Sequence, residues 1–245
     1  MKMKRKYIRG VLKRFGKVFL LAFFAFQLYI LARLYLFASC VIPTYSMSPT
    51  LQGGDYIITS LQIPGRRIWE KNAEGNLIPN RKKGIREVRK NDVVVFNFPY
   101  AYSNDKMILS NKLFYCKRCV ALPGENYRWE WNQKMHNIYL PQAGDVLSIN
   151  SLNYEDYRKC IEYETQERLV RKGDVIYLAD SVITKYRFRH DYYFMRGDNV
   201  KDSYDSRFWG LLPDDFILGV AQFIWFSKDL DTGRIRWSRM LKKIE

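Results

Sequence analysis

The longest run of hydrophobic residues lies near the N-terminus, from Val18 to Ile42. Only Gln27 and Arg33 interrupt this stretch of 25 residues. A helix needs about 20 mainly apolar residues to cross the core of a bilayer, so the run predicts one transmembrane helix. Its most apolar part ends near Leu36, which leaves Arg33 close enough to the outer surface to reach the head groups.

Two kinds of processed signal also begin with an apolar run. A cleaved secretory signal has an apolar region of about 7–15 residues, which is shorter than this one. Cys40 could belong to a lipoprotein processing site, but Phe37 fits poorly at the first position of such a site. We interpret Cys40 as one more apolar residue, and we expect the helix to remain as an anchor.

After the anchor, short runs of β-branched and aromatic residues alternate with Gly, Pro, Asn and Asp. Runs of this kind predict antiparallel strands in a sheet or a partly closed barrel. A spacing of three and four residues predicts one helix within 153–167. We therefore expect a mainly β protein behind the N-terminal helix. The predicted strands are 55–60, 93–98, 114–121, 175–179, 192–195 and 217–226.

The distribution of charge adds a direction to this picture. The formal net charge of +16 would by itself suggest a nucleic-acid partner. However, residues 1–17 hold eight bases and no acid, and residues 63–91 hold nine bases and three acids, so the rest carries only +2. We expect no nucleic acid. By the positive-inside rule, the first cluster predicts a cytoplasmic N-terminus and an extracytoplasmic remainder.

The second basic cluster lies in residues 61–91, which contain two Pro and three Gly. This composition predicts an exposed loop. The loop could simply be solvated, or its bases could contact anionic lipid head groups, which attract each nearby base by about 1 kcal/mol. The charge pattern favours neither interpretation over the other.

The four cysteines do not predict a disulfide or a metal site. Cys116 and Cys119 have the spacing of a redox or zinc pair, but residues i and i+3 of a strand point to opposite faces. No matching Cys/His pair follows them. The acidic segment 197–207 lacks the spacing and the closing Glu of a calcium loop. We expect no metal and no cofactor.

Two segments hold candidate catalytic residues. Pro43 and Pro49 should hold the chain extended around Ser46, a few residues from the membrane. Strand alternation puts Lys117 among apolar neighbours, where burial would lower its pKa from about 10.4 and make it a possible general base. Each residue also has an ordinary explanation: Ser46 could belong to a polar turn, and Lys117 could oppose aggregation at a sheet edge.

A third segment, 197–207 (GDNVKDSYDSR), is by itself a hydrophilic turn. In this order after an N-terminal anchor, the three segments resemble those of the type I signal peptidases (leader peptidases), the membrane-anchored Ser-Lys endopeptidases of bacteria. The resemblance runs from about Ile42 to Ala221. Residues 126–190 match no motif and stand where this family has a smaller second β domain.

The resemblance implies a role for each matching residue. Ser46 would be the nucleophile and Lys117 the general base. The hydroxyl of Thr44 and the backbone N–H of Ser46 would stabilise the oxyanion, and Ser203 would orient the lysine amine. The chain's two histidines, His136 and His190, do not form a recognisable His-Asp relay in the sequence, which agrees with a lysine base.

The resemblance also implies an ion pair between Asp205 and Arg207 that braces the site, with Asp198 supporting it. Val200 stands where the family usually has an arginine, and Tyr45 where it commonly has a small residue. We therefore expect this chain to differ from its relatives in the bracing of the site and the shape of its pocket.

The expected organisation has a basic cytoplasmic segment (1–17) and a transmembrane anchor (18–42). A catalytic β domain (43–125 and 191–245) then carries the inserted second domain (126–190). The family removes N-terminal signal peptides from secretory preproteins, cutting after small residues through an acyl-enzyme at the outer face of the cytoplasmic membrane. The resemblance thus implies preproteins and membrane lipid as partners of a monomer.

Two other functions fit parts of the pattern. A membrane-anchored β module without catalysis could bind extracytoplasmic peptides in the same groove, although filled catalytic positions argue against it. A Ser-Lys autoprotease fused to an anchor would need an internal Ala-Gly cleavage site, and we expect this chain not to be one.

Overall fold

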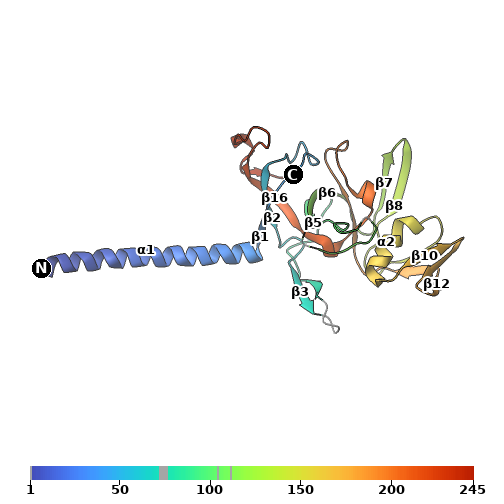
Figure 1. Ribbon diagram of the computed structural model, residues 1–245, viewed down its shortest axis with the longest axis horizontal. Coiled ribbons are helices and arrows are strands. Elements are labelled where there is room, and N and C mark those ends of the chain that lie inside the picture. The colour runs from blue at the N-terminus through green and yellow to red at the C-terminus, as the bar shows by residue number, and fades with distance from the viewer. Residues whose placement is uncertain (1, 72–76, 104, 111) are drawn as a thin grey trace.

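The computed structural model describes residues 2–71, 77–103, 105–110 and 112–245. A long helix, α1 (Lys2–Tyr35), extends from a β domain (Figure 1). Its part from Lys13 to Arg33 is long and apolar enough to cross a membrane. The helix ends before the expected anchor range 18–42 does, because residues 37–41 pair as a strand with 56–60.

One antiparallel sheet forms the body of the β domain, and it curls into a half-barrel (Figure 1). The strand order is β1-β2-β16-β5-β6-β14-β15, and β17 pairs with β16. The mainly β, antiparallel fold is thus confirmed. The strands are β1 (Phe37–Val41), β2 (Asp55–Ser60), β5 (Val93–Asn97), β6 (Phe114–Ala121), β14 (Tyr192–Arg196), β15 (Leu212–Pro213), β16 (Ile217–Ser227) and β17 (Lys242–Lys243).

The chain between β6 and β14 forms a smaller part with three separate ladders: a β7–β8 hairpin, a β9–β13 pair and a β10–β11–β12 sheet. Leu140 and Ile161 of this part belong to the same buried cluster as Phe96 and Phe194 of the main sheet, so the two parts share one core. The elements are β7 (Asn126–Trp131), β8 (Lys134–Tyr139), β9 (Val146–Ser148), α2 (Tyr154–Thr165), β10 (Leu169–Lys172), β11 (Val175–Leu178), β12 (Ser181–Ile183) and β13 (Lys185–Arg187).

Residues 61–91 are not simply the exposed loop that their charge predicted. They contain a hairpin of β3 (Arg67–Lys71) and β4 (Leu77–Arg81). Arg67 Nη1 donates to the backbone oxygen of Asp215 at 2.7 Å, and Arg81 Nη2 donates to that of Asp214 at 2.7 Å. The carbonyls belong to a short 3-10 helix, η1 (Asp214–Phe216), so two of the basic residues fasten the hairpin to the main sheet.

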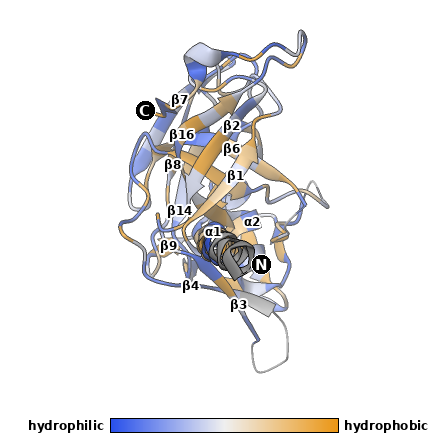
Figure 2. Ribbon diagram, turned by 90° about the vertical axis from the view of Figure 1, so that its left-hand side faces the viewer, coloured by the Kyte–Doolittle hydropathy of each residue, from blue (hydrophilic) through white to orange (hydrophobic). Residues whose placement is uncertain are grey.

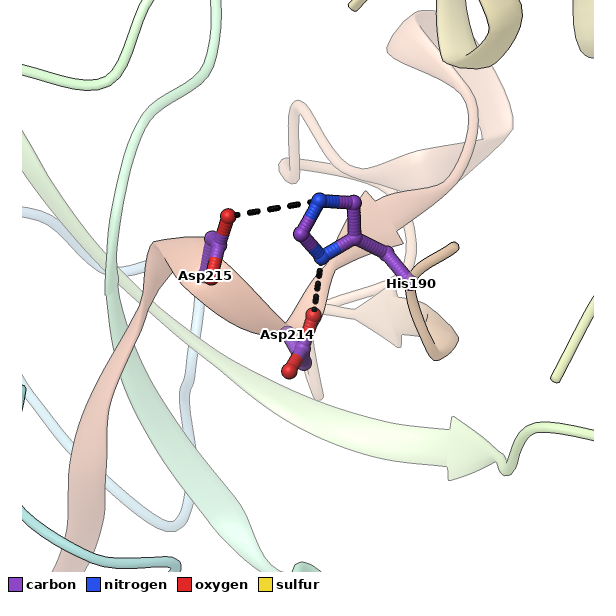
Figure 3. A group of neighbouring side chains, drawn as sticks. All are labelled: His190, Asp214 and Asp215. Atoms are coloured by element: carbon purple, nitrogen blue, oxygen red, sulfur yellow. Dashed lines mark hydrogen bonds and ion pairs between the residues drawn. The ribbon is translucent and has the colours of Figure 1, made fainter. Parts of the chain in front are cut away.

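A histidine links the inserted part to the same 3-10 helix (Figure 3). His190 Nδ1 lies 2.9 Å from Asp214 Oδ1, and His190 Nε2 lies 3.5 Å from Asp215 Oδ2. Each ring nitrogen faces a different carboxylate, which suits the two N–H donors of an imidazolium better than one metal ion. The sequence did not reveal these acid partners, because they lie 24 and 25 residues further along the chain.

Candidate active site

The segment around Ser46 is held by the apolar residues on either side of it. Ile42, Met47 and Leu51 are buried in a small cluster between β2, β5 and β16, whereas Ser46 is half-buried. The backbone N–H of Leu51 donates to the oxygen of Met47 at 2.9 Å. The chain is therefore extended only up to Pro43 and then turns, which corrects the expectation of an extended segment.

Lys117 lies in β6, where alternate side chains point into the half-barrel. Lys117 is 4% exposed, and Cys119 and Ala121 on the same face are fully buried. The alternation predicted from the sequence is therefore confirmed. Burial lowers the pKa of Lys117, although nearby acids, among them Asp205 and Asp198, act in the opposite direction.

The two segments meet at the proposed catalytic pair. Lys117 Nζ lies 2.5 Å from Ser46 Oγ, although 71 residues separate them in the sequence. Thr44 Oγ1 lies 3.3 Å from the same oxygen. All three residues line a cavity of about 430 Å³ whose other walls are mainly apolar and come from β1, β5, β6 and the loop after β14. These walls include Ile42, Val95, Leu113, Phe114, Tyr115, Cys116 and Tyr204.

The third segment packs against the backbone of the first. The N–H of Asn199 donates to the oxygen of Ser46 at 3.1 Å. A Cβ atom on Gly197 would lie 2.1 Å from Ser203 Oγ and 2.5 Å from the oxygen of Ser46, so only glycine fits between them. The turn after β14 thus supports the serine directly.

Asp205 and Arg207 form a buried ion pair, with Arg207 Nε 2.7 Å from Asp205 Oδ1 and both side chains at most 1% exposed. Burial alone would raise the pKa of Asp205, but hydrogen bonds from Arg207 and Gly197 outweigh it and lower the pKa. Arg207 Nη2 also donates to the oxygen of Val200 at 3.0 Å, and its guanidinium lies 4.8 Å from the centre of the Trp131 ring in β7. The inserted part therefore covers this pair.

Ser203 is buried beside this pair, but its Oγ has no partner at hydrogen-bonding geometry within the described residues. It lies close enough to the carboxylate of Asp205 to help lower the pKa of that group. No hydrogen bond joins Ser203 to the amine of Lys117 among the described residues, so its role in orienting the lysine stays a prediction.

Asp198 has a partner that the sequence did not suggest. Arg118 Nη2 lies 2.6 Å from Asp198 Oδ2, and Arg118 Nε lies 2.7 Å from Asp198 Oδ1. Arg118 also donates to Thr50 Oγ1 at 3.2 Å and to the oxygen of Asn91 at 2.8 Å. This arginine therefore joins β6, the turn at Asp198 and the end of the Ser46 segment. Strand alternation put it on the face away from Lys117 but could not identify a partner 80 residues away.

A second buried acid stabilises the same region from the C-terminal side. Asp55 is fully buried at the start of β2 and accepts from Arg239 Nη2 at 2.6 Å and from Ser227 Oγ at 2.7 Å. Arg239 also donates to the oxygen of Thr50 at 2.9 Å. The sequence predicted the strand that begins at Asp55 but contained no signal that Arg239 would pair with it.

The four cysteines are all unpaired, and Cys40 and Cys116 line the cavity. Burial raises the pKa of Cys116 to about 12, so its thiol is neutral at physiological pH. These cysteines thus serve as apolar wall.

Comparisons with known proteins identify the family of this chain. The family described as "Signal peptidase, peptidase S26" matches residues 13–226. Signal peptidase I of Pseudomonas aeruginosa is 28% identical over 235 residues, covering 89% of this chain and 73% of that protein. Signal peptidase I of Aquifex aeolicus is 30% identical over 205 residues, covering 80% and 78%. This chain belongs to the signal peptidase family, peptidase S26.

Proposed function

We propose that this protein is a signal peptidase I that removes N-terminal signal peptides from secretory preproteins, with Ser46 as nucleophile and Lys117 as general base. The observation that carries the proposal is the 2.5 Å contact between Ser46 Oγ and the amine of a lysine that is 4% exposed. A serine hydroxyl needs a base to attack an amide at neutral pH, and a desolvated lysine can be that base.

In the proposed reaction, neutral Lys117 takes the proton of Ser46 as Oγ attacks the scissile carbonyl carbon. The tetrahedral oxyanion accepts hydrogen bonds from the Thr44 hydroxyl and the backbone N–H of Ser46. The lysine then gives its proton to the leaving amine, and an acyl-enzyme remains. Water, activated by the same lysine, attacks this ester and releases Ser46.

The surrounding residues hold this pair in place. Asp205, braced by Arg207, accepts from the N–H of Gly197 at 3.0 Å, and Asp198 fastens the same turn to β6 through Arg118. We propose that Ser203 turns its hydroxyl towards the lysine amine when substrate binds. Each step of the proposed reaction then uses only these side chains, the backbone and water.

The cavity suits a substrate chain that lies extended along β6 or the Ser46 segment and places small side chains against apolar walls. We propose that α1 crosses the cytoplasmic membrane with its N-terminus in the cytoplasm, so that the cavity faces the extracytoplasmic side. The protein would then meet preproteins whose signal sequences lie in the same bilayer. We propose that it acts as a monomer with the domain organisation expected from the sequence, except that the anchor ends at Tyr35.

The test is cleavage of one purified preprotein by the full-length protein in detergent, with the new N-terminus identified by mass spectrometry. We expect one cut after a small residue, and no cut by Ser46→Ala. Ser48→Ala, which changes a half-buried serine in the same segment, is the matched control and should keep activity. Cleavage by Ser46→Ala at the wild-type rate would refute the proposed nucleophile.

Self-cleavage is a second candidate function, because the chain contains one Ala-Gly pair of the kind that a Ser-Lys autoprotease would cut, Ala143-Gly144. The pair lies in a turn before β9, where the N–H of Gly144 donates to the oxygen of Phe188 at 2.8 Å. Neither residue lines the cavity at Ser46. We therefore expect the purified chain to keep its full mass during the assay.

A further inference from the structure

The hairpin β3–β4 begins beside the end of α1. The guanidinium of Arg66 lies 4.3 Å from the centre of the Tyr35 ring, and Gln62 Nε2 donates to the oxygen of Tyr35 at 2.6 Å. Figure 1 shows the hairpin projecting to the side of the helix, and Figure 2, which views the domain along α1, shows β3 and β4 close to the helix end. The candidate span ends at Arg33, so in a bilayer crossed by α1 the base of the hairpin would lie at the level of the head groups.

The base of this hairpin is fixed to the main sheet. Arg81 Nη2 donates to the oxygens of Asp214 and Ile217 at 2.7 and 2.8 Å, and Arg67 donates to Asp215 and to Asn97 Oδ1 at 2.6 Å. These two arginines are thus used inside the protein. These contacts distinguish the hairpin from a loop that is only solvated. They also hold the remaining bases at a defined position relative to α1.

Those remaining bases are exposed. Lys71, Lys82 and Lys83 all point into solvent, and Ile85 beside them is 75% exposed. Lys82 lies 3.8 Å from Glu70, but both side chains are about half exposed, and an ion pair of this kind contributes little. Arg66 is half-buried against Tyr35 but stays charged, and together with the three exposed lysines Lys71, Lys82 and Lys83 it makes up what we call the basic hairpin surface.

We propose that the basic hairpin surface binds the head groups of anionic phospholipids in the leaflet from which α1 emerges. Head groups are the anions that lie at the level of this surface, and their charge is complementary to it. A base next to an anionic leaflet gains about a fivefold preference over a neutral one. Three or four bases held together would orient the domain on the membrane. The inference rests on α1 spanning the bilayer and does not depend on the peptidase reaction.

The test measures how fast each lysine of the full-length protein reacts with a water-soluble acetylating reagent. The protein is reconstituted in vesicles of phosphatidylcholine alone or with phosphatidylglycerol, and labelling is read by mass spectrometry. Lys134 in β8 and Lys172 in β10 are internal controls, because both are exposed and their strands lie away from α1 in Figure 1. We expect Lys71, Lys82 and Lys83 to react at least threefold more slowly in the anionic vesicles, with the controls unchanged.

Two further arms separate electrostatic binding from simple proximity. At 1 M salt the screening length falls to about 3 Å, so the slow labelling should return to its rate in neutral vesicles. Lys82→Gln with Lys83→Gln should restore fast labelling of Lys71, whereas Lys134→Gln with Lys172→Gln should not. Equal labelling rates of Lys71, Lys82 and Lys83 in the two kinds of vesicle would overturn the proposal. Labelling in anionic vesicles that stays slow at 1 M salt would overturn it as well.

Discussion

At the scale of single residues, the proposed mechanism depends on a lysine that is kept from water. An exposed lysine would be protonated at neutral pH and could not accept the proton of Ser46. The interior of the half-barrel removes Lys117 from solvent, and the sequence indicated this through the alternation of β6. Three of the predictions belong to this scale.

The first prediction concerns the protonation of Lys117. Because burial lowers its pKa, catalytic efficiency should rise with pH along a limb whose apparent pKa lies below the ordinary lysine value of about 10.4. The measurement is kcat/KM against pH for a peptide substrate. Lys117→Met should abolish activity without unfolding the protein. Lys90→Met, at an exposed site, should keep activity. A limb at the ordinary lysine value would mean that another group is the base.

The second prediction concerns Thr44, whose hydroxyl lies 3.3 Å from Ser46 Oγ. Thr44→Val removes one oxyanion donor, which typically costs about 2.7–4 kcal/mol in the transition state. We expect kcat to fall by this amount, with a smaller change in KM, and Thr44→Ser to be nearly silent. If Thr44→Val turned over substrate as fast as the wild type, the backbone donor would be sufficient.

The third prediction concerns Arg118, which lies on the face of β6 away from Lys117 and pairs with Asp198. Removing this guanidinium leaves the carboxylate of Asp198, which is 14% exposed, without its charged partner. Because the pair is largely but not fully buried, breaking it should cost up to about 3 kcal/mol, so we expect a lower melting temperature and reduced kcat. Arg118→Lys should recover only part of both, because an ammonium lacks the planar fork that pairs with the carboxylate and the further donors that reach Thr50 and Asn91. Unchanged melting of Arg118→Ala would rule out this bracing role.

At the scale of elements, the junction at η1 holds the inserted part, the hairpin β3–β4 and β16 together. Its charge depends on His190. Burial alone would lower the pKa of His190, but the hydrogen bond to Asp214 and the charges of Asp215 and Glu164 outweigh it and raise the pKa to about 8. The junction therefore carries a positive imidazolium at neutral pH.

The fourth prediction follows from that shift. Since the folded pKa lies above the unfolded value of about 6.5, the imidazolium stabilises the fold below about pH 6.5, and this contribution is lost as the pH rises through about 8. The effect is at most about 2 kcal/mol. The melting temperature should fall as the pH is raised from about 6.5 to about 8, and His190→Gln should abolish this pH dependence. His136→Gln, at the other histidine, is the control and should keep the wild-type dependence.

The elements that the sequence predicted well are those whose pattern is local. The alternation in β2 and β6 and the turn residues around them indicated the strand bounds, and the helix predicted within 153–167 is α2. The hairpin β3–β4 was not predicted, because its strands are fixed by Arg67 and Arg81 contacting carbonyls more than 130 residues away. Composition describes such bases as solvated, and only the folded chain reveals their partners.

The residues of the candidate site were likewise predicted where their pattern is local and missed where it is not. The ordered motifs indicated Ser46, Lys117 and the ion pair of Asp205 with Arg207, since each motif is short and contiguous. The partnership of Arg118 with Asp198 depends on the antiparallel pairing of β6 with β14, which puts Arg196 opposite Arg118 and the turn at Asp198 beside it. No pattern within either segment could have predicted it.

At the scale of the whole molecule, one long helix extends from one end of a β domain, and the proposed orientation in the membrane depends on it. The fifth prediction is that residues after Tyr35 lie outside the cytoplasm, because eight bases precede the apolar run. A reporter inserted at Asn150, an exposed position in a turn, should be active only in the extracytoplasmic compartment. A cytoplasmic signal at Asn150 would contradict the proposed function as well.

The direct passage of α1 into β1 has a consequence for which bond the protein can reach. Ten residues (36–45) separate the end of α1 from Ser46, and five of them form β1 (Phe37–Val41). A strand rises about 3.3 Å per residue, so β1 spans roughly 17 Å. Its pairing with β2 keeps this spacer stiff, so that with α1 in the membrane, as proposed, Ser46 would stay at a nearly constant distance from the lipid surface. The distance of a peptide bond from the membrane surface would thus limit which bonds reach Ser46. The fit of substrate side chains in the cavity would then select among those bonds.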